Sequence, residues 1–339
     1  MLYDPAHPDR PFFKSVVCIL LPSLLPQRPA FTFMRFIPVL LTGVLLGILP
    51  ASLHAQEAPE RHQSVRITDT QGNNITFDAG ETAFADTVVS FTPGDPWSDQ
   101  DPTQGTLALG MPNYKRGRGI STAITLGCSG TLQLQFTDNV LIDRPGPDLH
   151  VFEVGPDVEP TFVAVSTDGQ NWQEVGKVEG GTASVDIAAV AEPGDVFRFV
   201  QLTDDGNDCS GNYPGADIDA VGAIHASDVL MLSGRLLFDL DSSALRPEAR
   251  TALQDIAETL QERSVNTVTI VGHTDAQGTD EHNRTLSRKR AQSVRTHLVE
   301  QLGVTSIDFT IRGAGSSEPR ASNETATGRR QNRRVEFIF

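Results

Sequence analysis

Gly272-His273-Thr274-Asp275 precedes Asn283-Arg284-Thr285-Leu286-Ser287-Arg288-Lys289-Arg290-Ala291, and these two stretches decide how the carboxy-terminal third of the chain folds. The β-branched run from Val268 to Val271 places Asp275 just past a strand, and Arg290 follows fifteen residues later in a helical pattern. One carboxylate and one guanidinium that face a shared pocket suit a zwitterionic ligand, because the acid binds an ammonium group and the arginine binds a carboxylate. Neither stretch contains a Gly-x-Ser-x-Gly elbow or a His-Glu-x-x-His motif, so the pattern predicts a binding site and not a catalytic one.

Four motifs make residues 227–339 resemble the OmpA-like peptidoglycan-binding domain. They are Phe238-Asp239-Leu240-Asp241-Ser242-Ser243-Ala244-Leu245, the turn that ends at Asp275, the helix start at Asn283, and Gly328-Arg329-Arg330-Gln331-Asn332-Arg333-Arg334-Val335-Glu336. The resemblance implies a ligand, the diaminopimelate of the peptidoglycan stem peptide, whose free amino-acid end is a zwitterion. It also places Asp275 and Arg290 at the two gripping positions, with Thr274, Asn283 and Phe238 shaping the pocket.

Hydrophobic periodicity in this region predicts an α+β domain. Pro247 fits the first turn of a helix, and Ala249, Leu253, Ile256 and Leu260 then form one apolar stripe. Asp280 is the expected N-cap of the next helix, whose stripe is Ser287, Ala291, Val294 and Leu298. Strands are expected at 265–271, 309–312 and 333–339. Strands that alternate with helices in this way predict a mixed sheet with helices on one face.

Two features of the same region have simpler explanations than a second function. His273 has no second His or Cys at ligand spacing, so we do not expect it to bind a metal. A cluster of basic residues suggests binding to nucleic acid; it consists of Arg329, Arg330, Arg333 and Arg334. However, residues 227–339 hold 15 Lys and Arg against 15 Asp and Glu. Because this balance leaves no net positive field, the sequence predicts no nucleic-acid partner.

The beginning of the chain has the layout of an export signal. Residues 34–55 combine a short basic start at Arg35, an apolar run and a small-residue end at Ala55, which predicts a signal peptide cleaved before Gln56. The apolar run is short for a membrane span of ~20 residues, although an uncleaved anchor remains an alternative. Residues 1–33 are interpreted as a start-site artefact or pre-region, and 56–63 as a linker.

Residues 64–226 differ from the rest in charge and pattern. They hold 24 Asp and Glu against 7 Lys and Arg, a net charge of −17, which indicates a second domain that ends near Ala226. Short alternating runs between turn signals, at 131–136, 149–152, 161–165 and 196–200, predict an all-β sandwich. The hairpin signal at Asp168-Gly169, together with Phe197 to Leu202, resembles the discoidin, or galactose-binding-like, jelly roll.

Two sites are expected in this acidic β-rich segment. Cys128 and Cys209 are the two cysteines that follow the signal, and an even pair in an exported protein predicts a disulfide, with two free buried thiols as the alternative. Clustered carboxylates supply the oxygen ligands that Ca²⁺ prefers. The candidate ligands are Asp148, Glu153, Asp217 and Asp219, and the alternative is a solvated acidic surface.

The sequence therefore predicts a non-catalytic protein of the periplasm, associated with the outer membrane or the cell wall. Its last domain would bind peptidoglycan, and its β-sandwich would bind a carbohydrate or an envelope protein. One alternative is an outer-membrane β-barrel anchored to peptidoglycan, which the short runs and sparse aromatic residues disfavour. The other is a glycan-active envelope enzyme, which would need a pair of carboxylates at catalytic spacing.

Overall fold

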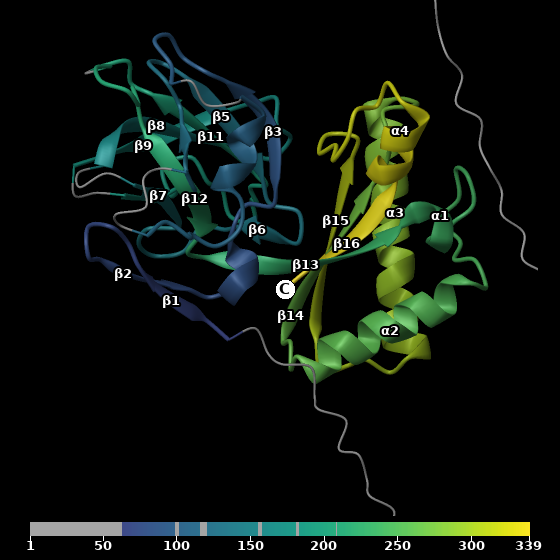
Figure 1. Cartoon of the computed structure of the whole chain (residues 1–339). Helices are drawn as coiled ribbons and strands as arrows, with labels where there is room; N and C mark the ends of the chain where they lie inside the picture. The colour runs from purple at the N-terminus through teal and green to yellow at the C-terminus, as the bar shows by residue number, and fades with distance from the viewer. Residues whose placement is uncertain (1–62, 99–101, 116–120, 155–157, 181–182, 208) are drawn as a thin grey trace, which may run out of the picture. The chain divides into compact units, whose positions relative to one another are not determined.

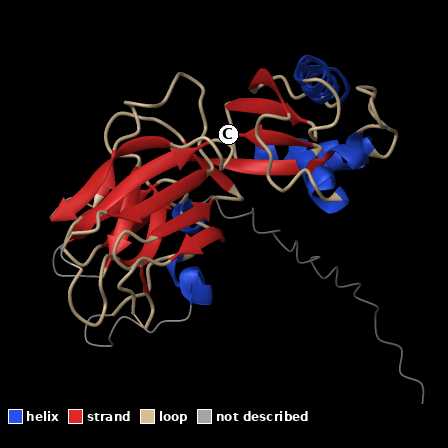
Figure 2. Cartoon of the chain, turned by 90° about the horizontal axis from the view of Figure 1, so that it is seen from above, coloured by secondary structure: helices blue, strands red, loops and turns tan. Residues whose placement is uncertain are grey.

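The computed structural model describes residues 63–98, 102–115, 121–154, 158–180, 183–207 and 209–339, all within one compact unit, Gln56–Phe339. Two predicted segments lie outside these ranges, namely the pre-region (1–33) and the signal peptide (34–55). So does the predicted linker (56–63), except for its last residue. Within them, no helix is both long enough and apolar enough to cross a membrane. Strands predominate before residue 226, and the longest helices follow it (Figure 2).

Residues 64–226 form two larger antiparallel sheets. In order across the first sheet, the strands are β10 (Ser184–Val185), β7 (Leu149–Glu153), β12 (Asp217–Ala223) and β4 (Ile124–Thr125). In order across the second, they are β3 (Thr87–Thr92), β5 (Thr131–Gln135), β11 (Phe199–Asp204), β8 (Val158–Ser166) and β9 (Gln173–Gly180). A hairpin of β1 (Val65–Thr68) and β2 (Asn74–Phe77), a 3-10 turn at Gly80–Ala83 and another at Pro102–Ala108 complete the segment.

Both sheets contribute to one hydrophobic core. Leu132 and Leu134 of β5 and Val163 of β8 are fully buried in it, as are Val151 of β7 and Ile218 of β12. Alternate residues of β5 face this core, as period-two patterning requires. The predicted hairpin is confirmed: β8 and β9 are antiparallel neighbours, and Gly169 in their turn has a φ of +73°. The fourth predicted run, 196–200, begins before the strand, because β11 starts at Phe199.

The carboxy-terminal region is built on a mixed five-stranded sheet (Figure 1). In order, its strands are β15 (Asp308–Gly315), β14 (Thr267–His273), β16 (Arg334–Ile338), β13 (Ala226–Ser233) and β6 (Asn139–Leu141). Its helices are α1 (Gly234–Leu237), α2 (Ala249–Glu262), α3 (Asp280–Thr296) and α4 (Ala326–Asn332), with a π-turn at His297–Gln301. Among the described strands only β14 and β15 pair in parallel, as expected when a helix, here α3, connects two strands.

One face of this sheet packs against the predicted apolar stripes. Leu253 and Leu260 of α2 and Val294 of α3 share a buried cluster with Ile270 of β14 and Phe337 of β16. Each fully buried Leu or Val side chain contributes about 1.5–3 kcal/mol by leaving water. The hydrophobic periodicity therefore placed α2, α3 and both central strands correctly.

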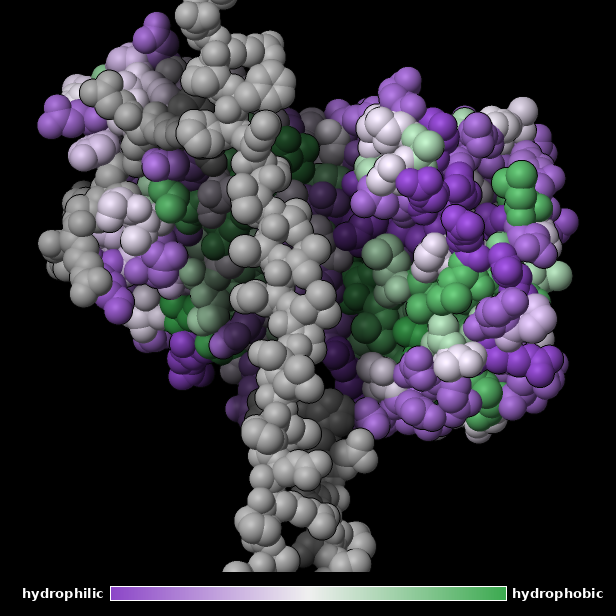
Figure 3. All heavy atoms as spheres, turned by 45° about the vertical axis from the view of Figure 1, so that its right-hand side comes forward, coloured by the Kyte–Doolittle hydropathy of each residue, from purple (hydrophilic) through white to green (hydrophobic). Residues whose placement is uncertain are grey.

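The opposite face of the sheet is covered by residues of the β-rich segment. Val271 and Ile338 cluster there with Val140 of β6 and with Val196, and β6 pairs with β13 at Ala226–Asp228. The predicted domain boundary at 226/227 thus falls at the start of a strand that has neighbours on both sides. Figure 3 shows hydrophobic residues gathered among hydrophilic ones on one face of the molecule.

Two helix starts differ from the sequence expectations. Thr279, and not Asp280, is the N-cap of α3, and its hydroxyl accepts a hydrogen bond from the backbone N–H of His282 at 3.3 Å. Asp280 lies instead in the first turn, where its charge interacts favourably with the helix dipole. Pro247 lies before the N-cap Glu248 and outside the first turn of α2, a displacement of the size that helix ends commonly show.

Candidate functional site

A cavity of about 550 Å³ opens beside α1, α3 and α4. Phe238 and Arg290, two of the residues expected at the peptidoglycan site, line it together with side chains that were not expected there. The described residues that line it are Gly234, Arg235, Phe238, Asp239, Leu240, Arg246, Gln277, Arg290, Ala326, Arg329, Arg330 and Arg333. The cavity is therefore rich in guanidinium groups.

Asp275 is held at the end of β14 by close packing of this strand against α3. A Cβ at Gly272 would come within 2.1 Å of the Ser287 carbonyl oxygen, so only glycine permits this approach. The N–H of Thr274 donates to the carbonyl of Gly315 at 2.8 Å, and the side-chain amide of Asn283 donates to the carbonyl of Asp275 at 3.3 Å. Thr274 and Asn283 are buried and fix the turn, and neither is among the residues that line the cavity.

The Asp275 carboxylate already has a cationic partner. Its Oδ2 forms an ion pair with Arg333, which follows α4 and lines the cavity, and its Oδ1 accepts the backbone N–H of Gln277 at 3.1 Å. We expected Asp275 and Arg290 to be the opposing charges of the site, and Arg333 was not among the expected site residues. The carboxylate instead adjoins the cavity through Arg333.

Arg290 is 5% exposed and is fixed on three sides. Its Nε donates to the carbonyl of Ser242 at 2.8 Å, its Nη2 lies 3.4 Å from the carbonyl of Asp239, and its guanidinium carbon lies 5.2 Å from the centre of the Phe238 ring. Burial lowers the pKa of Arg290; the nearby Asp241 and Asp275 raise it, and Arg333 lowers it. The guanidinium remains charged, because arginine does not deprotonate in proteins.

A second cluster of charges lies on the sheet face away from α2 and α3. Glu336 is fully buried, and its Oε1 lies 2.7 Å from Arg334 Nε. Its Oε2 forms an ion pair with Arg198, which belongs to the β-rich residues 64–226. The same oxygen lies 3.2 Å from His273 Nε2. Burial, aided by Arg334, lowers the pKa of His273 to about 4. His273 is therefore a neutral core residue, and no group of possible metal ligands among the described residues includes it.

The four acids expected to bind calcium do not form one set. Asp148 precedes β7 and Glu153 ends it, so their backbones are separated by about 17 Å of extended chain. Asp217 and Asp219 lie near Glu153, on the paired strand β12. Burial raises the pKa of each to about 6, against the hydrogen bonds each accepts. We expected calcium to be held by some of these four acids. Asp148 lies apart from the other three, and a calcium site at Glu153, Asp217 and Asp219 stays a prediction.

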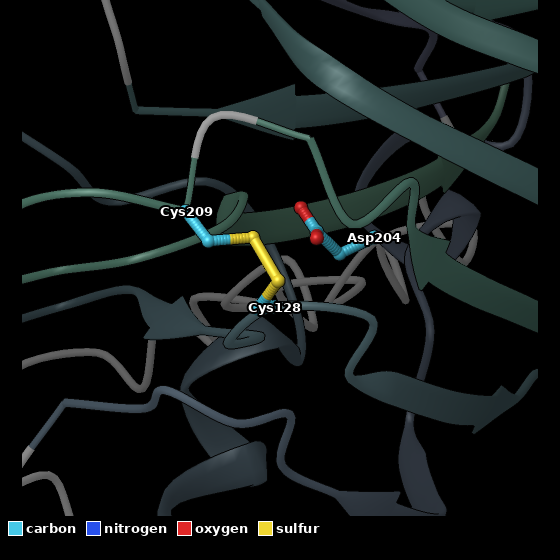
Figure 4. A group of neighbouring side chains, drawn as sticks. All are labelled: Cys128, Asp204 and Cys209. Carbon is cyan, nitrogen blue, oxygen red and sulfur yellow. A yellow bond between two sulfur atoms is a disulfide. The ribbon is translucent and has the colours of Figure 1, made fainter.

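Other ligand atoms do converge among the described residues. Carboxylate oxygens of Asp143, Asp148 and Asp186 lie within 4.8 Å of one another, but Asp148 already accepts hydrogen bonds from Arg144 N, Ile187 N and His225 Nδ1. The other group is Cys128, Asp204 and Cys209 (Figure 4). Its sulfurs form a disulfide, as predicted, so they are not available as thiolate ligands.

Comparisons with known proteins agree with the carboxy-terminal assignment. Residues 237–333 match the OmpA family, and the chain is 37% identical over 124 residues to a peptidoglycan-associated lipoprotein of Pseudomonas putida, in an alignment that covers 36% of this chain and 74% of the relative. The chain belongs to the OmpA family. The discoidin-like resemblance of residues 64–226 has no such support; the structure establishes only that they are rich in β-strands.

Two further relatives match this chain over a smaller part of their own length. Outer membrane protein A of Bordetella avium is 42% identical over 100 residues, which is 30% of this chain and 51% of the relative. Outer membrane porin F of Pseudomonas aeruginosa is 34% identical over 135 residues, which is 40% of this chain and 39% of the relative. The chain thus spans about half or less of the length of these two relatives. All three are envelope proteins, which supports the predicted periplasmic, outer-membrane or cell-wall association.

Proposed function

We propose that the protein binds peptidoglycan through the cavity beside α3 and does so without catalysis. The observation that carries the proposal is the placement of Phe238 and Arg290 in the cavity wall, next to the Asp275–Arg333 ion pair. A zwitterion such as the free end of diaminopimelate matches this arrangement of charges. The relationship to a peptidoglycan-associated lipoprotein supports the same ligand.

In the proposed complex, Arg290 donates to the ligand carboxylate. Its Nε and Nη2 are directed at backbone carbonyls, so the remaining N–H groups of the guanidinium are the ones left for the ligand. The ligand ammonium joins Arg333 at the Asp275 carboxylate, which has lone pairs for both cations. Each charge-assisted hydrogen bond contributes roughly 1.5–3 kcal/mol before the cost of removing water.

Co-sedimentation with purified peptidoglycan sacculi tests this site. Asp275→Asn and Arg290→Gln should each lower the bound fraction at least tenfold, because each removes one charged contact of about 1.4 kcal/mol or more. Asp255→Asn in α2 and Arg284→Gln in α3 change exposed charges that do not line the cavity, so both should bind as the wild type does.

Arg290→Lys separates a lost ligand contact from a lost fold. Lysine keeps the charge but not the planar set of donors, so this variant should melt close to the wild-type temperature and still bind weakly. Wild-type retention of sacculi by folded Asp275→Asn and Arg290→Gln would refute the assignment of the site.

The β-rich residues 64–226 are proposed to act as a sandwich-type binding module that the anchored protein presents in the periplasm. Their two antiparallel sheets around one core and their net charge of −17 support a binding role. Incubation of the whole protein with a glycan array and with sacculi tests it. Bound glycans would support the module, whereas released muropeptides would favour the glycan-active enzyme instead.

A further inference from the structure

The cavity beside α3 carries more positive charge than a single zwitterion requires. Six of the described residues that line it are arginines, and the only acid among them is Asp239. The surrounding region does not explain this excess, because residues 227–339 are balanced at 15 basic and 15 acidic side chains. The positive charge is therefore concentrated in the cavity.

Most of these guanidinium groups have no carboxylate partner among the described residues. Arg246 lies 3.5 Å from Asp239 and 3.4 Å from Glu248, and Arg333 pairs with Asp275. Arg329 donates to the carbonyls of Asn323 and Glu324, and Arg290 donates to carbonyls as described above. Backbone carbonyls orient these groups without neutralising them.

Arg235 and Arg330 form the exposed rim of the cavity. Arg235 is the second residue of α1, and no carboxylate among the described residues lies within salt-bridge distance of it. Arg330 lies on α4, and its Nη2 donates to the Thr327 hydroxyl at 2.9 Å. Both rim guanidiniums are thus available to an anionic group that enters the cavity mouth.

We propose that the cavity selects stem peptides whose D-glutamate carries a free α-carboxylate, which Arg235 and Arg330 bind at the rim. This inference rests on the proposed function: Arg290 and the Asp275–Arg333 pair hold the zwitterionic end of diaminopimelate. The D-glutamate is joined to the other end of diaminopimelate, so its α-carboxylate is an anionic group outside the zwitterion. Its conversion to an amide removes the charge and keeps the size, so an amidated stem peptide binds more weakly.

Isothermal titration of the purified protein with two tripeptides tests the selectivity. The first is L-Ala-γ-D-Glu-meso-diaminopimelate with free carboxylates, and the second has the D-Glu α-carboxylate as its amide. Because exposed ion pairs are each worth at most about fivefold in affinity, the wild type should prefer the free acid by roughly five- to twentyfold. This preference should shrink as the salt concentration rises.

The double variant Arg235→Gln with Arg330→Gln should bind both tripeptides with equal affinity, at the level of the amidated peptide on the wild type. Arg250→Gln is the matched control, because Arg250 is exposed on α2 and does not line the cavity; it should keep the wild-type preference. Equal affinity of the wild type for both peptides, or a full preference in the double variant, would overturn the inference. If neither peptide binds the wild type, the proposed function fails as well; if only Asp275→Asn weakens binding, the proposed function stands and the selection by charge does not.

Discussion

Replacing Glu336 with glutamine should destabilise the protein more than any exposed charge substitution. The carboxylate is fully buried and compensates Arg334 and Arg198, which are 2% and 1% exposed. Another nearby acid, Glu318, is already bonded to Arg312. Glutamine has the same shape but no charge, so the two guanidiniums would remain buried without a counter-charge.

The size of the loss follows from that burial. Breaking a buried ion pair on one side costs about 3–5 kcal/mol, which is a large part of a typical total of roughly 5–15 kcal/mol. For a chain of this size it corresponds to a melting temperature lower by about 10 °C. Glu258→Gln is the matched control, because Glu258 is exposed on α2 and accepts a hydrogen bond only from Gln254; it should change the free energy of unfolding by less than about 0.5 kcal/mol.

Urea unfolding at two pH values completes the test. Burial opposes ionisation of Glu336, but the charges of Arg198 and Arg334 help to outweigh it, and the pKa of Glu336 lies well below its usual range. The stabilisation is therefore fully present above pH 4.5 and is lost only as the pH falls through the depressed pKa. The wild type should exceed Glu336→Gln by the same amount at pH 7 and pH 5.5. A difference below about 1 kcal/mol at both values would mean that water reaches the two arginines and that the reasoning from burial is wrong.

Three further variants test separate features of residues 64–226. Burial lowers the pKa of His150 to about 4, so its contribution to the free energy of unfolding falls on acidification from pH 6.5 towards 4; relative to the wild type, His150→Gln should gain about 1.4 kcal/mol per pH unit over this range, as urea titrations would measure. The pKa of Asp219 is raised to about 6 by burial, so its contribution runs the opposite way, and relative to the wild type Asp219→Asn should lose stability as the pH falls from 6 towards 4. The Cys128–Cys209 bridge joins residues 81 apart, so its removal by Cys128→Ala with Cys209→Ala should cost roughly 2–5 kcal/mol; calorimetry that found the same melting temperature with and without reductant would contradict this.

The sequence predicted the elements of the carboxy-terminal region well because its signals are local. The stripe Ala249, Leu253, Ile256 and Leu260 is buried as one face of α2, since a period of 3.6 residues leaves little freedom once a sheet lies against it. The strand ends and helix caps were less accurate, because they depend on single hydrogen bonds. The Thr279 hydroxyl, one residue before Asp280, is sufficient to cap α3.

The sequence could not predict which charges pair. Asp275 and Arg333 are 58 residues apart, and Arg198 and Glu336 are 138 apart, so no helical or strand period relates them. Three of the four residues in Arg333-Arg334-Val335-Glu336 are charged, which is a composition typical of an exposed segment. In β16, alternation directs Val335 and Phe337 to the helix face and Glu336 to the other, where the β-rich segment supplies Arg198.

The distribution of charge over the whole protein gives the arginine-lined cavity its electrostatic contrast. Outside the cavity lining, residues 227–339 retain 9 basic and 14 acidic side chains, the remainder after six arginines and one aspartate are set aside. Residues 64–226 add a net charge of −17. A polyanion such as a stem peptide with several carboxylates is therefore repelled by most of the surface. Since potentials at ~0.15 M salt decay over about 8 Å, only a group that has reached the cavity mouth is attracted by Arg235 and Arg330. In the proposed complex, the acidic segment therefore disfavours binding of the peptide elsewhere on the protein, and the arginine rim favours binding in one place.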